Sequence, residues 1–293
     1  MKKLYLYIVL SALFFGSMEV ALKLAGGALD PFQITFLRFL IGGLLLTPFA
    51  AHERRGMRAA GGEPLTPRLW LWVAFLGAVN VPFCMIFFQL GVLHSNAATA
   101  AVIFSCNPVF TMFFAHALTP DDKMNRRKAL ALAIGIAGLV FMIRPWDLQP
   151  GNTFLGAALS LAAAAVFALY GVLNAKTLVR VGTFTQTASS FVIGALILLA
   201  LLPPLGRPIF AGFTDNLPIL VYTSVVVTGG GYLFYFLALK KSSPSTAAIV
   251  FFLKPVIAPV FAVLVLAEQI TWNMYCGIAL ILAASYILLF RKK

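Results

Sequence analysis

The sequence predicts an all-α membrane protein whose ten transmembrane helices form two inverted five-helix repeats, with the N and C termini in the cytoplasm. Three observations lead to this fold class: the composition, an internal repeat and the placement of basic residues. Of the 293 residues, 61% are hydrophobic and only 11% are charged, whereas soluble proteins carry about 25% charged residues. A chain this apolar cannot cover its surface with polar side chains, so we expect it to lie in a lipid bilayer.

A stretch of 23 residues occurs twice and predicts two like halves, residues 1–146 and 147–293. Residues 87–109 match residues 234–256 at nine positions without a gap. The matched pairs, all 147 residues apart, are Phe87/Phe234, Leu90/Leu237, Ser95/Ser242, Thr99/Thr246, Ala100/Ala247, Ala101/Ala248, Phe104/Phe251, Pro108/Pro255 and Val109/Val256. The early helices match more weakly at an offset of 153, which pairs Phe14 with Phe167, Lys23 with Lys176 and Gln33 with Gln186. A repeat of half the chain within apolar sequence is typical of membrane transporters.

Ten apolar runs are long enough to cross a bilayer core, which takes about 20 residues per helix. They lie at about 4–25, 31–51, 69–92, 96–118, 127–145, 152–175, 183–203, 217–239, 244–267 and 271–290. Most connections between them are short turns, and residues 52–68 are expected to form the one sizeable loop. The first run follows two lysines, as in a signal peptide, but we expect it to be retained as the first span.

The basic residues predict the orientation of these spans. With ten spans, 17 of the 22 Lys and Arg residues lie on the side of the N-terminus. The opposite side holds Lys23, Arg144 and Arg207, and the spans themselves hold Arg38 and Lys254. The positive-inside rule therefore places both termini in the cytoplasm. The net charge of +13 is explained by this topology, so we expect no nucleic acid partner.

An odd number of spans in each half means that the second half enters the membrane from the opposite side. Two inverted halves can exchange conformations, which exposes a site at their interface alternately to each side of the membrane. We expect no metal and no cofactor, because the three cysteines lack metal-ligand spacing. A Walker A motif is also absent from the sequence, so nucleotide hydrolysis by that route is excluded.

Three charged residues lie inside spans and are candidate substrate contacts: Glu19, Arg38 and Lys254. A charge at the centre of a membrane helix costs at least about 2.5–3.5 kcal/mol, so such residues face protein or water. In one interpretation Glu19 and Lys254 hold the two ends of a zwitterion, and Glu19 also carries a coupling proton. In the other, Glu19 forms a structural ion pair with Lys254 or Arg38.

Uncharged polar residues inside spans are further candidates for substrate binding. They are Asn80, Gln89, Asn107 and Asn174. The alternative is that these amides form hydrogen bonds between helices. Some aromatic residues are expected to line the cavity as well, with Phe14, Tyr170, Tyr232 and Tyr235 as candidates.

Helix breaks are expected at Pro82, Pro108, Pro255 and the run Gly229-Gly230-Gly231. Proline removes a helical hydrogen bond, and a freed carbonyl at membrane depth needs a partner such as water in a cavity. Pro82 and Gly229 are 147 residues apart, and breaks in corresponding helices of two halves indicate a binding site and its gates. The glycines alternatively allow close helix packing.

Several of these motifs together resemble the EamA family of the drug/metabolite transporter superfamily. They are Phe15-Gly16-Ser17 with Lys23, Arg38, Ala97-Ala98-Thr99-Ala100-Ala101 with Pro108, and Ser245-Thr246-Ala247-Ala248 with Lys254, Pro255 and Glu268. The resemblance covers the whole chain. It implies a ten-helix carrier of the bacterial inner membrane, and members of this family mostly export amino acids, other metabolites or amphipathic drugs. Glu19 and Lys254 stand where the family usually has uncharged residues, which argues against a neutral drug cavity.

The leading hypothesis is a secondary transporter that exports amino acids or similar small metabolites, driven by protons or by the substrate's own gradient. Its expected partners are a small-molecule substrate, protons and the bilayer, and we expect a monomer or weak dimer. One alternative is a multidrug exporter of lipophilic cations that bind to Glu19. A membrane-embedded enzyme acting on lipids is a distant alternative, since Asp121-Asp122 is the one acidic pair and basic residues follow it. A receptor or assembly subunit would not need inverted halves.

Overall fold

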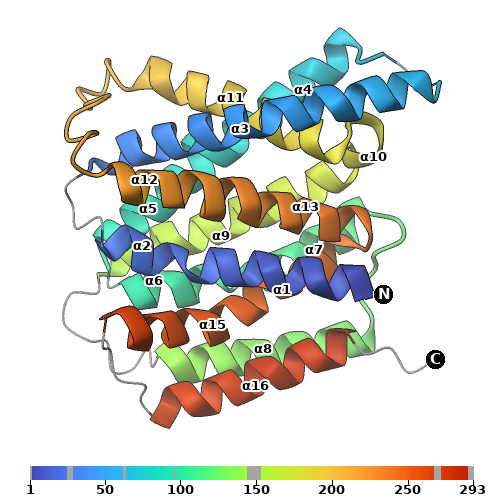
Figure 1. Ribbon diagram of the computed structural model, residues 1–293. Coiled ribbons are helices and arrows are strands. Elements are labelled where there is room, and N and C mark those ends of the chain that lie inside the picture. Colours follow the sequence, from blue (N-terminus) through green and yellow to red (C-terminus); the bar gives the residue numbers. More distant parts are fainter. Residues whose placement is uncertain are drawn as a thin grey trace.

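The computed structural model describes residues 2–24, 29–61, 64–95, 97–143, 153–266 and 272–289, and these residues form a bundle of helices without a strand (Figure 1). The first half contains α1 (Lys2–Gly16), α2 (Met18–Leu24), α3 (Pro31–Ala59), α4 (Pro67–Ala78), the π-helix η1 (Val79–Met85), α5 (Ile86–Leu93), α6 (Ala97–Phe104), α7 (Asn107–Leu118) and α8 (Arg126–Ile143). The second half contains α9 (Phe154–Ala175), α10 (Leu178–Val181), α11 (Thr183–Leu201), α12 (Leu217–Tyr222), the π-helix η2 (Thr223–Gly231), α13 (Tyr232–Lys240), α14 (Pro244–Ala247), α15 (Ile249–Leu266) and α16 (Trp272–Leu289).

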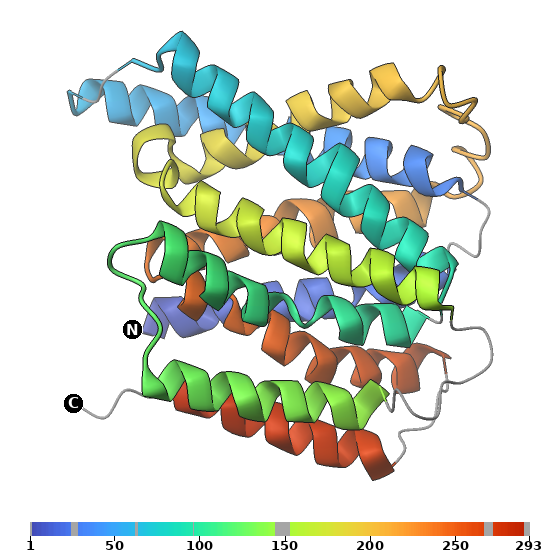
Figure 2. The same cartoon turned by 180° about the vertical axis from the view of Figure 1, so that it is seen from behind.

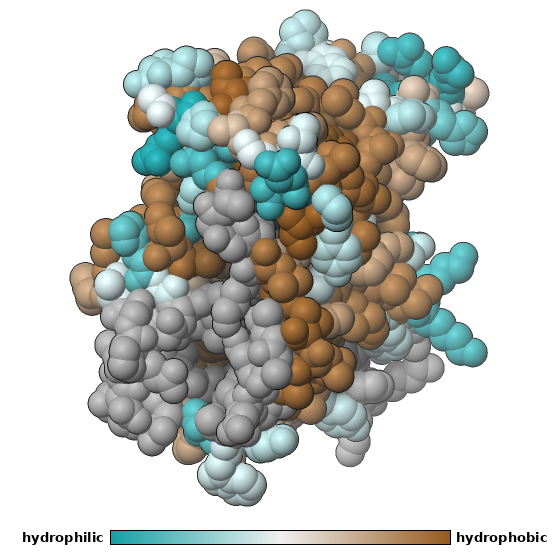
Figure 3. All heavy atoms as spheres, turned by 60° about the vertical axis from the view of Figure 1, so that its left-hand side comes forward, coloured by the Kyte–Doolittle hydropathy of each residue, from teal (hydrophilic) through white to brown (hydrophobic). Residues whose placement is uncertain are grey.

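Seven helical stretches of the described chain are long and apolar enough to cross a membrane. They are Lys2–Leu22, Pro31–Ala59, Pro67–Leu93, Phe154–Ala175, Thr183–Leu201, Leu217–Lys240 and Pro244–Val265. Three other predicted spans correspond to α6 with α7, to α8 and to α16, so the total of ten crossings stays a prediction. Many large apolar side chains point outward, such as Leu71, Phe113 and Leu264. Figure 3 shows the resulting brown surface, with hydrophilic residues gathered toward its margins. The chain is therefore a multi-pass membrane protein.

The third helix is longer than the sequence predicted. The expected span ended at residue 51 and a loop was expected over 52–68, but α3 continues to Ala59 and α4 begins at Pro67. The expectation of a long loop was wrong because charged Glu and Arg residues end an apolar run without ending a helix. Asp30 caps the start of α3 by accepting hydrogen bonds from the backbone nitrogens of Phe32 and Gln33.

Helices that hold the same place in the two halves run in opposite directions. α3 and α11 lie side by side and antiparallel, and so do α8 and α16 at one edge of the bundle (Figures 1 and 2). The first turn of α1 and the last turn of α16 lie at the same end of the bundle (Figure 1).

Small residues allow backbones of the two halves to touch. A Cβ atom on Gly77 of α4 would overlap the carbonyl oxygen of Ser190 in α11, and a Cβ on Gly42 of α3 would lie 2.9 Å from the carbonyl oxygen of Ser224 in η2. Close approach through small residues is the usual way in which membrane helices gain packing energy, because lipid supplies no hydrophobic drive between them.

Glu53, near the end of α3, caps the first turn of α11. Its carboxylate accepts hydrogen bonds from the backbone nitrogens of Thr183 (2.8 Å) and Thr185 (2.9 Å) and from the Thr185 hydroxyl (3.1 Å). Gly182 leads into α11 with φ of 95°, and a Cβ at this residue would overlap the carboxylate. A negative group at a helix N-terminus also stabilises the helix dipole. A side chain of the first half therefore caps the N-terminus of a helix in the second half.

A related contact joins the halves at the opposite end of the bundle. Arg207, after α11, forms an ion pair of 3.2 Å with Asp30, the cap of α3. Arg207 lies 153 residues after Arg54, which donates a 3.4 Å hydrogen bond to the carbonyl oxygen of Arg180. Residues near the end of α3 thus hold the start of α11, and Arg207, which follows α11, holds the start of α3.

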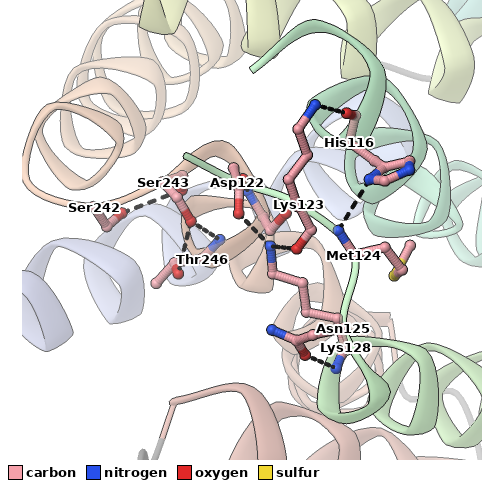
Figure 4. Close-up of polar contacts among 10 residues, drawn as sticks. His116, Asp122, Lys123, Met124, Asn125, Lys128, Ser242, Ser243 and Thr246 are labelled. Atoms are coloured by element: carbon pink, nitrogen blue, oxygen red, sulfur yellow. Dashed lines mark hydrogen bonds and ion pairs between the residues drawn. The ribbon is translucent and has the colours of Figure 1, made fainter. Parts of the chain in front are cut away.

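A third contact between the halves centres on Asp122, in the connection between α7 and α8 (Figure 4). One carboxylate oxygen accepts a hydrogen bond from Lys128, and the other accepts a 2.9 Å bond from the backbone nitrogen of Ser245 in α14. Burial alone would raise the pKa of the Asp122 carboxyl, but the hydrogen bonds from Lys128 and Ser245 and the lysine charge outweigh burial and hold this pKa below its ordinary value.

Replacing Glu53 by Gln is expected to lower the free energy of unfolding by about 1 kcal/mol, the usual value of a helix cap. The amide nitrogen would face a backbone donor of α11, so one hydrogen bond is lost together with the charge. The thermal denaturation midpoint in detergent, followed by tryptophan fluorescence, measures the effect. Asp215→Asn is the matched control, because Asp215 is exposed and accepts a bond from neighbouring Thr214. Equal midpoints for the two variants would show that the cap contributes nothing.

Asp122→Asn is expected to destabilise the protein by about 2 kcal/mol at neutral pH, since hydrogen bonds to a charged group are lost. Because the folded-state pKa is lowered, the contribution of the carboxylate is present above the unfolded pKa of about 4 and is lost as the pH falls through the folded value. The difference in denaturation midpoint between wild type and Asp122→Asn should therefore be constant from about pH 6 to 8 and shrink below about pH 4. A difference that grows on acidification would contradict this assignment.

Candidate functional site

Two π-helical segments lie at corresponding positions in the two halves. Pro82 lies inside η1, and Gly229, Gly230 and Gly231 form the end of η2. A π-helix pairs each carbonyl with a nitrogen five residues later, and such segments are rare and often mark functional sites. Both departures from α-helical geometry thus coincide with residues for which the sequence predicted helix breaks.

The two π-helical segments meet at Tyr232, the residue that follows η2. The Tyr232 hydroxyl donates a 3.3 Å hydrogen bond to Oδ1 of Asn80 in η1 and lies 3.5 Å from the sulfur of Met85 at the end of η1. Asn80 and Met85 are buried, as is Tyr232. The polar contact between the halves is therefore enclosed by protein.

Two pairs of equivalent residues touch here, which locates the axis that relates the halves. Met85 and Tyr232 are 147 residues apart, and so are Phe104 and Phe251, whose ring centroids lie 5.9 Å apart in a T-shaped arrangement. Residues related by a two-fold axis contact each other only where they lie close to that axis. The axis therefore passes through this cluster, at the interface where transporters of repeated halves bind their substrates.

Buried aromatic rings surround the axis. The ring of Tyr232 packs on those of four phenylalanines from α1, α3, α9 and α11: Phe15, Phe39, Phe167 and Phe191. Two other aromatic candidates from the sequence, Tyr170 and Tyr235, also pack on Phe167. Such T-shaped and tilted contacts are favourable arrangements for aromatic side chains.

Two glycines of η2 lie against phenylalanine rings of α1, one of them the candidate Phe14. A Cβ on Gly230 would lie 2.9 Å from Phe14, and a Cβ on Gly231 would lie 2.7 Å from Phe15. Both distances are too short for carbon atoms, so α1 packs against η2 through these glycines. Close packing, the alternative role weighed for this run, is therefore present at these two residues.

Lys254 of α15 lies in an aromatic enclosure beside the axis. Its side chain is only 1% exposed, and its Nζ lies 5.3 Å from the ring centroid of Phe88 and 5.2 Å from that of Phe104. Attraction between a cation and an aromatic ring reaches about 2 kcal/mol when both are desolvated. These rings stabilise a positive charge that the bilayer would otherwise exclude.

Arg38 of α3 brings a second cation to the same region. It is completely buried, and its terminal nitrogens lie 3.2 Å from the sulfur of Met18 and 3.4 Å from that of Met85. Its guanidinium carbon also lies 5.0 Å from the centre of the Phe39 ring. Thioether sulfur is a weak acceptor, so each of these two sulfur contacts is modest in strength.

Glu19 belongs to α2, next to Met18, but its side chain lies outside the described residues. Pairing of Glu19 with Lys254 or Arg38, or its contact with substrate, therefore stays a prediction.

The four amide candidates separate into two groups. Asn107 donates a 3.0 Å bond to the carbonyl of Ala164 and accepts one from Thr111, and Asn174 donates to the carbonyl of Tyr170 in its own helix. Asn107 therefore joins α7 to α9, whereas the Asn174 amide nitrogen bonds within α9 and its Oδ1 is buried without a hydrogen-bond partner among the described residues. The side-chain nitrogens of Asn80 and Gln89 are buried without a hydrogen-bond partner among the described residues. These two amides are thus the better candidates for contact with a ligand.

The other two candidate prolines differ in their relation to helix interruptions. Pro108 is the second residue of α7, directly after the interruption at residues 105–106. α15 continues through Pro255, and the interruption in that span lies at Ala248 instead. The two halves are therefore not identical in this pair of spans.

Sequence reasoning did not single out Met18, Met85 or Phe88 as parts of the site. Met85 was detectable, because the offset of 147 pairs it with Tyr232 just outside the repeated stretch. Phe88 was detectable in the same way, because the offset pairs it with the candidate Tyr235, whereas Met18 resembles many other apolar residues of the chain.

The chemistry of this cluster is that of a binding site. Its centre offers two cations, unpartnered amide donors and aromatic faces, which suit a carboxylate attached to an apolar or aromatic group. In the part of the chain that the structure describes, no group of three or more His, Cys, Asp or Glu residues is placed to hold a metal ion.

Comparison with known proteins agrees with this fold. The profile of the EamA-like transporter family matches residues 2–144 and again residues 154–290. A protein of Clostridium kluyveri, described as an uncharacterized transporter, is 34% identical over 98% of this chain and 93% of its own length. An S-adenosylmethionine uptake transporter of Rickettsia prowazekii is 23% identical over 61% of this chain and 57% of its own length.

A solved crystal structure shares the fold over the whole length of the chain. It superimposes with a TM-score of 0.77 and covers 98% of this chain and 97% of its own, at 19% identity. The two matches to the family profile and the 34% identity to the Clostridium protein show that the chain belongs to the EamA-like transporter family.

Proposed function

We propose that this protein is a secondary transporter of the bacterial inner membrane that exports amino acids or similar small metabolites by alternating access. The observation that carries the proposal is the enclosed pair of cations, Arg38 and Lys254, beside the axis between the halves. A buried charge in a membrane protein is costly and is retained where it serves a function. The carboxylate of an amino acid would bind beside these cations, and the aromatic rings would enclose its apolar part.

The proposed topology has ten spans, with residues 1–146 and 147–293 as inverted halves and both termini in the cytoplasm. The antiparallel course of equivalent helices supports the inversion (Figure 1). Basic residues gather at the end of the bundle where α1 begins and α3 and α13 end, including Lys2, Lys3, Arg54, Arg55, Arg58, Arg126, Arg127, Lys128, Arg180, Lys240 and Lys241. By the positive-inside rule this end faces the cytoplasm.

Alternating access then requires the contacts at one end to open while those at the other stay closed. At the cytoplasmic end the halves are joined by Glu53 with the start of α11 and by Asp122 with Ser245. At the opposite end they are joined by Arg207 with Asp30, and the hydroxyl of Thr153 donates a 2.7 Å bond to the carbonyl of His94. Both cations are sealed within the bundle, so we assign this conformation to an occluded intermediate.

The observed environment argues against the two main alternatives. Two buried cations repel a lipophilic cation, which disfavours a multidrug exporter of that kind. The carboxylate of Asp122 is committed to Lys128 and to the backbone of Ser245, which disfavours a catalytic metal site at the acidic pair. The transporter is expected to act on a small-molecule substrate, with protons as coupling ions, as a monomer or weak dimer.

Lys254→Met tests the substrate class, because methionine keeps the volume and the packing on the rings but removes the charge. Loss of a charged hydrogen bond is worth about 1.5–3 kcal/mol, so the KM for an amino acid should rise about 10- to 100-fold. Counterflow in proteoliposomes holding only this protein measures it, after a thermal-shift screen of amino acids and tetraphenylphosphonium has chosen the substrate. Lys240→Met, which removes an exposed lysine, is the matched control. Undiminished amino-acid counterflow, or improved tetraphenylphosphonium flux, would favour the drug-exporter alternative instead.

Glu19→Gln tests proton coupling. If Glu19 carries the coupling proton, transport driven by an imposed pH gradient should fall at least tenfold while substrate counterflow persists, because counterflow needs no net proton movement. The two assays are run on the same proteoliposomes, with Asp215→Asn as the control carboxylate. Loss of both activities would assign Glu19 to binding or structure and remove it as the coupling group.

A further inference from the structure

A pocket lies away from the axis, at the end of the bundle that we assign to the cytoplasm. It is an open hollow of about 280 Å³ between the end of α3, the start of α4 and the start of α11. Figure 1 shows these three helices meeting at the upper right. None of the candidate substrate residues lines it, so transport through the centre leaves this pocket unexplained.

Two arginines make the pocket basic. Arg54 and Arg58 of α3 both line it, and their spacing of four residues places them on the same face of the helix. Arg54 is held at the wall by its 3.4 Å hydrogen bond to the carbonyl oxygen of Arg180, while Arg58 is exposed. The carboxylate of Glu53, next to Arg54 in the sequence, accepts hydrogen bonds from the first turn of α11.

The rest of the lining suits a small polar group held near lipid. Thr47, Thr185 and Ser189 add polar residues to the lining. Its volume is at or below the lower end of the range for drug-sized ligands, about 300–1,000 Å³, so a headgroup fits better than a bulky metabolite. Trp70, 41% exposed, forms one wall, and tryptophan is enriched where membrane proteins meet the lipid headgroups.

Exposed apolar side chains lie next to two of the lining residues in the sequence. Phe49, beside the lining residue Ala50, and Leu71, beside Trp70, are both largely exposed. A ligand with a phosphate in the pocket would therefore place its hydrocarbon along these residues. Free phosphate would use the arginines but not this apolar surface.

We propose that this pocket binds a phosphate group through Arg54 and Arg58, and that an anionic phospholipid of the cytoplasmic leaflet supplies it. The planar guanidinium groups match the geometry of phosphate oxygens, and two positive charges favour a lipid with net negative charge over a zwitterionic one. The bound lipid would bridge α3 and α11, and the start of each of these helices contacts a residue of the opposite half.

The test uses the full chain in detergent and titrates dioleoylphosphatidylglycerol, dioleoylphosphatidylcholine or inorganic phosphate while recording the denaturation midpoint. Phosphatidylglycerol should raise the midpoint in a saturable manner, because a ligand that binds only the folded state stabilises it. Phosphatidylcholine and phosphate should give little change. Arg58→Gln should weaken the apparent affinity about fivefold and Arg54→Gln/Arg58→Gln about 25-fold, from the usual attraction of one basic residue to an anionic lipid.

The matched controls are Arg55→Gln and Arg55→Gln/Arg68→Gln, which remove the same charges from exposed residues outside the pocket. The single variant Arg58→Gln keeps the test valid if loss of Arg54 impairs folding. If the pocket variants and the control variants weaken the affinity for phosphatidylglycerol equally, the lipid responds to general surface charge, and the proposed site is wrong. Saturable stabilisation by inorganic phosphate, without preference for phosphatidylglycerol over phosphatidylcholine, would overturn the lipid assignment.

Discussion

The hydrogen bond from Tyr232 to Asn80 joins the two halves at their common axis, and the rest of the bundle is arranged around it. Each partner belongs to or borders a π-helical segment, where the backbone departs from the regular pattern. Lipid offers no water to satisfy such a backbone, so it must be enclosed by protein or face a hydrated cavity. The aromatic rings packed on Tyr232 provide the enclosure in the conformation seen here.

Around that axis the bundle stabilises charge in a medium that opposes it. Lys254 is held by the faces of Phe88 and Phe104, and Arg38 by two methionine sulfurs and an aromatic face. Contacts with thioether sulfur and with aromatic faces are each modest in strength. Strong contacts occur instead at the ends of the bundle, where carboxylates cap helices of the opposite half.

Much of this architecture was predictable because the signals were strong and local. Membrane character follows from composition, and the offset of 147 places Pro82 and Gly229 at corresponding points, where the structure has its two π-helices. The length of α3 was not predictable from hydropathy, because its last turns are stabilised by Glu53 reaching α11, a contact remote in sequence. Met18, beside Arg38, was equally hidden, since one apolar residue among many carries no mark of its tertiary neighbour, whereas Met85 and Phe104 fall on the offset of 147.

The pairs that meet on the axis are unlike in chemistry: methionine faces tyrosine, and the place of Lys254 is taken in the first half by Asn107. When two halves exchange shapes, such differences make the inward-facing and outward-facing forms unequal in energy. A protein assembled from two copies of the first half would have no central lysine, and one assembled from two copies of the second half would have two. The fused gene therefore preserves an asymmetry that a symmetric dimer of identical subunits has no means to encode.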